Sequence, residues 1–426
     1  MAPTHFDVNA VREQVPALNQ RINGSQPVYF DNPGGTQVPQ RVIDAISRYL
    51  IEANSNSHGA FLTSRRTDET IQSAREAVAD LLNAPSAQQI VFGPNMTTLT
   101  FGLSRAIGQT LNPGDEIILT RMDHDANVSP WLLVARDRGL TVHWVDFDVE
   151  TGLLDVAQMA ELAGERTKLI ACVYASNALG TVNDIPRVVE IAHSVGALAA
   201  IDAVQYAPHG PIDVQALGCD FLTCSAYKFF GPRVGALYGR AELLESLPAY
   251  KVRPASDDAP ERWETGTQNH EGLAGTAAAV DYLAWVGEQF GAPYAEAAGA
   301  YEGRRNVLKR ALHAIKDYEK TLSQHLIAGL ESIPGVALRG ITDDEQLSQR
   351  VPTVIFTLDG YAPGAVAQAL GEQGIYLWDG NYYALEAMQR LGYEGQGGMV
   401  RVGPVHYNTI AEIDRFLEAL NELASA

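Results

Sequence analysis

Short apolar runs alternate with amphipathic, helix-like stretches between Gln89 and Arg240 of this 426-residue chain. Continuous apolar runs of strand length, separated by helical patterns, are typical of a mainly parallel sheet with helices on both faces. Ligands of such sheets bind beyond the carboxyl ends of the strands. The pattern therefore predicts a large α/β domain with seven strands, at Ile90 to Phe92, Glu116 to Thr120, Thr141 to Phe147, Leu169 to Ala175, Ala197 to Ile201, Phe221 to Cys224 and Gly235 to Tyr238.

After Gly239 the pattern changes to longer helical stretches followed by a second, shorter set of strands. We expect helices at Leu273 to Phe290, Tyr301 to Ile333, Ala365 to Gln373 and Ile410 to Leu423, and strands at Val336 to Arg339, Thr353 to Leu358, Ile375 to Trp378 and Val400 to Val402. This set predicts a smaller α+β domain. We place the large domain at residues 25–300 and the small domain at residues 301–426, together with residues 1–24.

Charge and cysteine content narrow the classes of function. The formal net charge is -20, which repels phosphate backbones and anionic membranes, so we expect no nucleic-acid and no membrane partner. The chain has no apolar stretch long enough to span a bilayer and no apolar leader, which predicts a cytoplasmic protein. Its three cysteines lack paired spacing, so we expect reduced core residues and neither disulfides nor a metal site.

Lys228 and Asp202 are the most informative pair of polar residues. Asp202 closes one apolar run, and Lys228 follows the next. A desolvated lysine amine forms an imine with an aldehyde, and a carboxylate at the ring nitrogen keeps a pyridine protonated as an electron sink. Either residue alone would be expected at the surface. Together they predict a pyridoxal phosphate site with Lys228 as the covalent attachment point.

Further polar residues follow other predicted strands. Met96 and Thr97 open a helix whose free backbone amides can hold a phosphate or simply begin the helix. His124 can stack on an aromatic cofactor or lie at the surface, and a metal clamp is not expected there because neighbouring side chains of an extended segment point apart. Asn177 and Gln205 can each bind a phenolic oxygen or serve as turn residues.

Seven motifs, in this order, make the chain resemble the class V aminotransferases, and among them the cysteine desulfurases. They are the runs Tyr29 to Asn32, Asp123 to Asn127, Ser176 to Gly180, Asp202 to Gln205, Ser225 to Lys228 and Glu264 to Thr267, and Arg401 with Tyr407 to Thr409. The resemblance covers most of the chain. It implies the fold type I of pyridoxal phosphate-dependent transferases, pyridoxal 5′-phosphate as cofactor, a homodimer and a small amino acid as substrate.

The resemblance also implies a role for each matching residue. Lys228 would carry the cofactor and move protons, Asp202 would pair with the ring nitrogen, and His124 would stack on the ring. Asn177 and Gln205 would flank the phenolic oxygen. The phosphate would be held by Met96, Thr97, Ser225 and Tyr227, with Gly266 and Thr267 reaching across from a second subunit.

For the substrate, the resemblance implies that Arg401 grips the carboxylate, because a planar guanidinium binds carboxylates in a bidentate manner. A surface ion pair is the alternative for Arg401. We also place Asn32 and Tyr383 at the substrate. Tyr382 or Tyr383 can face the substrate as an acid or simply pack the mouth of the pocket. Tyr227 stands where the family usually has a histidine, and its phenol can donate to the phosphate instead.

The chain departs from cysteine desulfurases at the residue that receives sulfur. Those enzymes resemble one another in a late loop that carries a cysteine, whereas this chain has Tyr382 and Tyr383 there and no cysteine after Cys224. A tyrosine cannot store sulfur as a persulfide. We therefore expect β-elimination with carbon–sulfur cleavage, or transamination. The alternatives are Cα epimerisation, desulfuration onto another acceptor, and a silent cofactor-binding scaffold.

Overall fold

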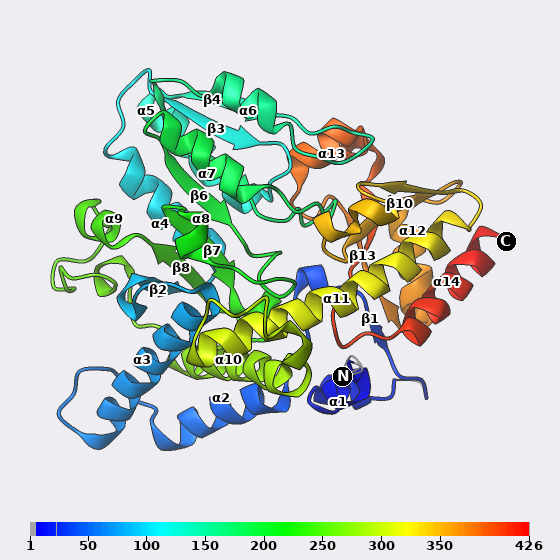
Figure 1. Ribbon diagram of the computed structural model, residues 1–426, viewed down its shortest axis with the longest axis horizontal. Helices are drawn as coiled ribbons and strands as arrows, with labels where there is room; N and C mark the ends of the chain where they lie inside the picture. The colour runs from blue at the N-terminus through cyan, green and yellow to red at the C-terminus, as the bar shows by residue number, and fades with distance from the viewer. Residues whose placement is uncertain (1–5, 23, 426) are drawn as a thin grey trace.

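A seven-stranded sheet lies at the centre of the larger part of the molecule (Figure 1). The computed structural model describes residues 6–22 and 24–425, so residues 1–5, 23 and 426 of the predicted small domain lie outside the described residues. The strands are β2 (Ile90–Gly93), β3 (Glu116–Thr120), β4 (Thr141–Val145), β5 (Thr167–Val173), β6 (Leu198–Asp202), β7 (Phe221–Ser225) and β8 (Gly235–Gly239). Their order is β2-β8-β7-β6-β5-β3-β4. β8 is antiparallel to both neighbours and the other pairs are parallel, which confirms the predicted sheet.

Side chains of this sheet alternate between two apolar cores, as the two-residue period of a strand requires. In β3, Ile117 and Leu119 enter one core, and Ile118 enters the other. The first core is covered by α4 (Met96–Gly108) and α5 (Ser129–Arg138). The second is covered by α3 (Leu62–Leu82), α7 (Ile185–Ser194) and α10 (His270–Phe290). Both faces of the sheet are thus buried, which explains the uninterrupted apolar runs in the sequence.

The C-terminal part carries two small sheets. Their strands are β1 (Val28–Tyr29), β9 (Val336–Arg339), β10 (Val354–Leu358), β11 (Ile375–Tyr376), β12 (Trp378–Gly380) and β13 (Met399–Val402). One sheet is antiparallel, in the order β12-β13-β10-β9, and the other pairs β1 with β11 in parallel. The prediction of a single strand from Ile375 to Trp378 is wrong. The chain changes sheets at Leu377, because Ile375 is buried against β1 whereas Trp378 pairs with Arg401.

The remaining helices are α1 (Val8–Glu13), α2 (Gln40–Glu52), α6 (Val156–Leu162), α8 (Val214–Leu217), α9 (Ala241–Ser246), α11 (Gly303–Glu331), α12 (Pro363–Glu372), α13 (Leu385–Leu391) and α14 (Ile410–Ala424). α11 is the longest of them. Its first half packs with α10 on the core of the large sheet, and its second half packs with α14 on the core of the small sheets (Figure 1). The four predicted helices are confirmed, with ends that differ by up to three residues. No helix in the described part of the chain is both long and apolar enough to cross a membrane.

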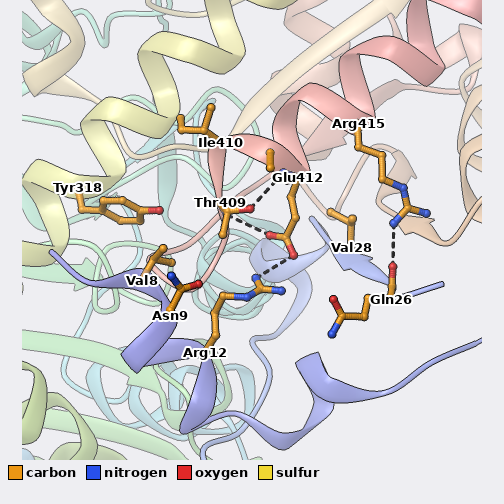
Figure 2. A pocket seen from close by; sticks show the side chains of 11 residues that line it. Val8, Asn9, Arg12, Gln26, Val28, Tyr318, Thr409, Ile410, Glu412 and Arg415 are labelled. Carbon is orange, nitrogen blue, oxygen red and sulfur yellow. Dashed lines mark hydrogen bonds and ion pairs between the residues drawn. The ribbon is translucent and has the colours of Figure 1, made fainter.

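The N-terminal segment packs on the start of α14 (Figure 2). Arg12 forms an ion pair of 2.8 Å with Glu412 and donates to the carbonyl of Tyr407. Glu412 also completes a capping box with Thr409, so the same carboxylate stabilises the helix end and the docked segment. These contacts join residues near 12 to the C-terminal helix. The predicted domain boundaries themselves stay a prediction.

Candidate active site

One cavity collects most of the predicted site residues at the carboxyl ends of the strands. It is lined by Met96, Thr97, His124, Ala126, Val173, Asn177, Asp202, Val204, Gln205, Tyr227 and Lys228. These residues end or follow β2, β3, β5, β6 and β7, whose carboxyl ends meet at one edge of the sheet. Eight of the eleven lining residues are ones that the sequence predicts.

Lys228 lies in the 3₁₀ turn Ala226–Lys228 that follows β7. Its amine donates to the carbonyl of Pro33 and lies 5.2 Å from the centre of the Tyr227 ring. Burial lowers the pKa of Lys228 to about 7, with a contribution from the positive charge of Arg401, while Asp202 and Asp31 oppose the shift. A substantial fraction of this amine is therefore neutral near pH 7, which is the form that attacks an aldehyde.

Asp202, the last residue of β6, lies on the cavity wall and is 3% exposed. One of its oxygens accepts a hydrogen bond of 2.9 Å from the backbone N–H of Val204. Burial raises the pKa of Asp202 to about 6, although that hydrogen bond and the charge of Lys228 lower it. A cationic ring nitrogen placed against this carboxylate would supply the missing counter-charge and keep it ionised.

His124 precedes a short 3₁₀ turn, and its Nδ1 accepts a hydrogen bond of 3.0 Å from the backbone N–H of Ala126. Its ring stacks on that of Tyr383, with the ring centres 5.5 Å apart and the planes 14° from parallel. Burial lowers the pKa of His124 to about 3, helped by the charges of Lys228 and Arg401. The imidazole is thus neutral at physiological pH and suited to stacking rather than to acid catalysis.

The two amides of the site hold their nitrogens away from the cavity. Asn177 donates through Nδ2 to the carbonyl of Tyr382 at 2.9 Å, which fixes the orientation of its amide because a carbonyl only accepts. Its Oδ1 is buried and has no hydrogen-bond partner among the described residues. Gln205 directs Nε2 toward the Thr353 hydroxyl at 3.0 Å. The Oδ1 of Asn177 is therefore left for a ligand.

The start of α4 forms the end of the cavity that suits an anion. The Asn95 side chain caps the helix by accepting from Thr98 N–H at 2.9 Å, and Met96 N–H donates to the Ser225 hydroxyl at 3.2 Å. A Cβ at Gly235 would lie 2.3 Å from the carbonyl carbon of Asn95, so only glycine lets β8 pass this close to the helix. The positive end of the helix dipole and the hydroxyls of Thr97 and Ser225 can hold a phosphate there.

Arg401, in β13, is 5% exposed and lies next to Asn177. It donates through Nη1 to the backbone carbonyl of Asn177 at 2.9 Å, and its guanidinium carbon is 4.4 Å from the centre of the Tyr382 ring. Burial lowers the pKa of Arg401 to about 10. Its Nε is buried without a partner among the described residues. A buried guanidinium with a free edge can bind a carboxylate. The surface ion pair that the sequence left open for Arg401 is not formed with any residue that the structure describes.

Three groups of predicted residues are not part of the lining of this cavity. Gly266 and Thr267 do not line the cavity of Lys228 but a separate hollow, together with His58. Tyr383 is 72% exposed and covers the His124 ring from outside the lining, and its contact with substrate stays a prediction. Asn32 is buried, and its amide nitrogen donates to the carbonyls of Tyr29 and Gly403. Its amide oxygen accepts from the Tyr407 hydroxyl. These bonds indicate that Asn32 supports the backbone next to Pro33, and its predicted contact with substrate stays untested.

Several polar residues near the cavity were missed by sequence reasoning. Asp31 has a buried oxygen without a described partner, and burial raises its pKa, opposed by the charges of Arg401 and Lys228. His209, Glu319 and Thr353 lie behind Gln205. The sequence held a signal for Glu319, because this residue interrupts the apolar stripe along α11, which an amphipathic helix turns toward the core. His209 and Thr353 carried none.

The described residues fit pyridoxal phosphate. The site offers a partly neutral amine at Lys228, a buried carboxylate at Asp202, a neutral ring at His124 and a helix start near Ser225. The buried oxygen of Asn177 has no hydrogen-bond partner among the described residues and can accept from a ligand. Among the described residues, no group of three or more histidine, cysteine or carboxylate side chains could hold a metal ion.

Comparisons with known proteins agree with this arrangement. The family model described as Aminotransferase class-V matches residues 28–301 and 291–416. The chain is 35% identical, over 98% of its length, to a probable cysteine desulfurase of Mycolicibacterium paratuberculosis, and it spans only 58% of the length of that relative. It is 33% identical, over 99% of both chains, to the aminotransferase-like protein FGM3 of Gibberella zeae. The apo structure of a cysteine desulfurase from Thermococcus onnurineus has a TM-score of 0.86 at 27% identity and full coverage of both chains.

Proposed function

Since this chain belongs to the class V aminotransferase family of pyridoxal 5′-phosphate enzymes, we propose that it is a lyase that breaks the carbon–sulfur bond at Cβ of a small amino acid and releases the sulfur to solution. The site supports this reaction through one amine for proton transfer and one guanidinium for the substrate carboxylate. When bound, the cofactor supplies an electron sink that weakens the bonds to the substrate Cα.

The observation that carries the proposal is the position of the thiols. Cys172, Cys219 and Cys224 are each at most 1% exposed. Burial raises the pKa of Cys219 and Cys224 to about 12 and the pKa of Cys172 well above its ordinary value. A buried thiol of this kind is neither a nucleophile nor accessible to substrate sulfur. None of the three cysteines of this chain can therefore accept the sulfur as a persulfide. Reduced thiols also fit the cytoplasmic location that we expect.

Lys228 and Arg401 divide the chemical work in this proposal. Arg401 binds the carboxylate through its free edge and so places Cα next to the amine of Lys228. The neutral amine removes the proton from Cα and passes it to the departing sulfur, which leaves as a thiol. Water then releases the remaining three-carbon unit as pyruvate and ammonia. A pKa of about 7 suits both halves of this proton transfer.

The number of guanidinium groups at the cavity favours elimination over transamination. Arg401 donates to the backbone of Asn177, one of the residues that line the cavity. The lining itself includes no arginine that could serve as a second carboxylate-binding group. A transaminase that exchanges two dicarboxylic substrates would gain from a second such group. Desulfuration onto an external thiol is the second candidate, because several relatives are named cysteine desulfurases. Epimerisation and a silent scaffold stay open as outcomes of the test below.

A second subunit completes the site in this proposal. Gly266 and Thr267 are exposed and line the hollow next to His58 rather than the Lys228 cavity of their own chain. Glu264 anchors this segment, because Arg75 binds it through two hydrogen bonds of 2.7 and 2.8 Å. A rigidly anchored loop with a free tip is suited to reach into a neighbouring site of a symmetric homodimer.

Product analysis tests the proposed reaction. The holoenzyme is incubated with L-cysteine, S-substituted cysteines and L-alanine, with and without an added thiol. Elimination predicts pyruvate, ammonia and a free thiol in equal amounts from the cysteine derivatives without any acceptor. Alanine from cysteine, formed only with added thiol, would replace the proposal by external desulfuration. A keto acid with pyridoxamine phosphate, loss of optical purity, or no reaction would each contradict it in favour of the other candidates.

A further inference from the structure

Tyr382 and Arg401 form a cation–π pair next to Asn177, a residue that lines the cavity. The guanidinium carbon of Arg401 is 4.4 Å from the centre of the Tyr382 ring. Arg401 is 5% exposed, so its charge has lost most of its contact with water. An aromatic face attracts a cation more strongly in such a place than at the surface. The ring therefore compensates part of the hydration that the guanidinium has lost.

Hydrogen bonds hold Tyr382 through both its phenol and its backbone. The phenol donates to the carbonyl of Met399, which stands two residues before Arg401 in β13. The backbone carbonyl of Tyr382 accepts from Nδ2 of Asn177 at 2.9 Å. The carbonyl of Asn177 in turn accepts from Nη1 of Arg401 at 2.9 Å. Tyr382, Asn177 and Arg401 thus form a closed set of contacts that restrains the guanidinium.

The turn that carries Tyr382 has an unusual backbone. Tyr382 and Tyr383 have φ angles of 54° and 58°, a left-handed conformation that is rare for bulky residues. The carbonyl of Tyr383 accepts from the backbone N–H of Asp125 at 2.6 Å, and the Asn381 side chain accepts from the N–H of Tyr383 at 3.1 Å. A backbone of this kind persists only where surrounding contacts impose it. These contacts therefore hold the Tyr382 side chain in one place.

The contacts of Tyr382 suit the support of Arg401 better than acid catalysis. The phenol proton is already donated to a backbone carbonyl, and burial raises the pKa of the phenol. The N–H groups of a guanidinium lie in its plane, so a ring over its face leaves them available. Nε of Arg401 is buried and has no partner in the part of the chain that the structure describes. This edge is the one that a ligand carboxylate can reach.

We propose that Tyr382 is a positioning residue whose ring holds the guanidinium of Arg401 so that its free edge meets the substrate carboxylate. The proposal rests on the proposed function, which assigns that carboxylate to Arg401. An acidic neighbour would also hold the guanidinium, but it would occupy the N–H groups that the substrate needs and would cancel the attracting charge. An aromatic face stabilises the cation and does neither.

Tyr382→Leu tests the proposal, because it removes the ring and keeps the backbone carbonyl that Asn177 binds. The probes are S-methyl-L-cysteine and its carboxamide, which lacks the carboxylate. The Kd of each probe for the holoenzyme is measured by stopped-flow absorbance of bound pyridoxal phosphate, before turnover. We expect the Kd of the amino acid to rise about 10-fold, the effect of losing a desolvated cation–π contact, and the Kd of the carboxamide to stay the same.

Three further variants keep the test decisive. Tyr382→Phe retains the ring and should retain the wild-type ratio of the two Kd values. Tyr382→Met removes the aromatic face with a flexible side chain, and it serves if Tyr382→Leu does not fold. Tyr393→Leu is the matched control and should leave the ratio unchanged, because the Tyr393 ring lies 5.6 Å from the guanidinium carbon of Arg339, outside the cavity lining. An equal loss of the ratio in Tyr382→Phe or in Tyr393→Leu would overturn the positioning role.

The proposed function and this inference fail in different ways. A wild-type holoenzyme that binds both probes equally, or neither of them, would refute the assignment of the substrate carboxylate to Arg401 and with it the proposed function. A wild type that prefers the amino acid, together with the same preference in Tyr382→Leu and Tyr382→Met, would refute only the positioning role of Tyr382.

Discussion

Two lysines of this chain show that burial alone does not make an amine reactive. Burial lowers the pKa of both Lys228 and Lys309 to about 7. Lys309, however, is completely buried in α11, and its amine donates hydrogen bonds to the carbonyls of Leu81 and Ile212. Lys228 lies in a cavity beside a carboxylate, a neutral imidazole and a helix start. The neighbours of the amine, rather than its pKa, therefore identify the attachment point.

The lowered pKa of Lys228 predicts how cofactor loading depends on pH. Only the neutral amine attacks the aldehyde, and its fraction rises as the pH increases through the pKa of the folded protein. We expect the rate of loading of the apo protein to rise about 10-fold from pH 6 to pH 8 and to level off above pH 8. Stopped-flow absorbance measures this rate. A rate that keeps increasing up to pH 10 would show an unperturbed lysine instead.

At the residue scale, the sequence identifies groups that directly follow apolar runs. Lys228 and Asp202 each stand at the end of a predicted strand, and the topology of a parallel sheet brings such positions together. Glu319 and His209 could not be paired in this way, because their contact depends on how α11 crosses the loop after β6. Side-chain orientation was equally beyond the sequence, as Asn177 shows by directing its nitrogen to a loop carbonyl.

At the element scale, α11 joins the two halves of the molecule and holds a buried amine against α3. The Lys309 amine satisfies carbonyls at the end of α3 and in the loop before α8. We expect Lys309→Met to lower the free energy of unfolding by about 2 kcal/mol at pH 9, because two buried carbonyls lose a donor. Urea unfolding measures the change, and Lys168→Met, at an exposed amine with a single bond to Glu165, is the control.

The pH dependence of this difference has a definite sign. The folded-state pKa of Lys309 is about 7, below the ordinary value of 10.5, so the unfolded chain binds more protons between these two values. The stability that Lys309 contributes therefore increases as the pH rises from about 7 toward 10. The difference between wild type and Lys309→Met should grow over this range. A constant or shrinking difference would contradict the buried, neutral state of the amine.

The sequence predicts where strands and helices occur better than it predicts which sheet a strand joins. The seven apolar runs gave the large sheet because its strands are buried on both faces. The short stretch around Leu377 was misjudged, because its two halves pair with β1 and β13, which are distant in the sequence. Long-range pairing of this kind leaves no periodic signal in a segment of six residues.

At the scale of the whole molecule, the proposed dimer makes each site depend on two chains. Lys228 of one subunit would work with Thr267 of the other, so a Lys228→Ala chain and a Thr267→Glu chain should each fail to retain cofactor or activity alone. Coexpressed, they should form mixed dimers with one intact site, and random pairing gives about a quarter of wild-type activity. Absence of recovery, or full activity of Thr267→Glu alone, would contradict the shared site.

The central claim is that Lys228, beside Asp202, carries pyridoxal phosphate. Borohydride reduction of the holoenzyme, followed by peptide mapping with mass spectrometry, tests it most directly. Lys309 is an internal control, since its amine has the same lowered pKa but no cavity. We predict a phosphopyridoxyl group on Lys228 and none on Lys309. An adduct on Lys309, on surface lysines only, or on no lysine would contradict the account.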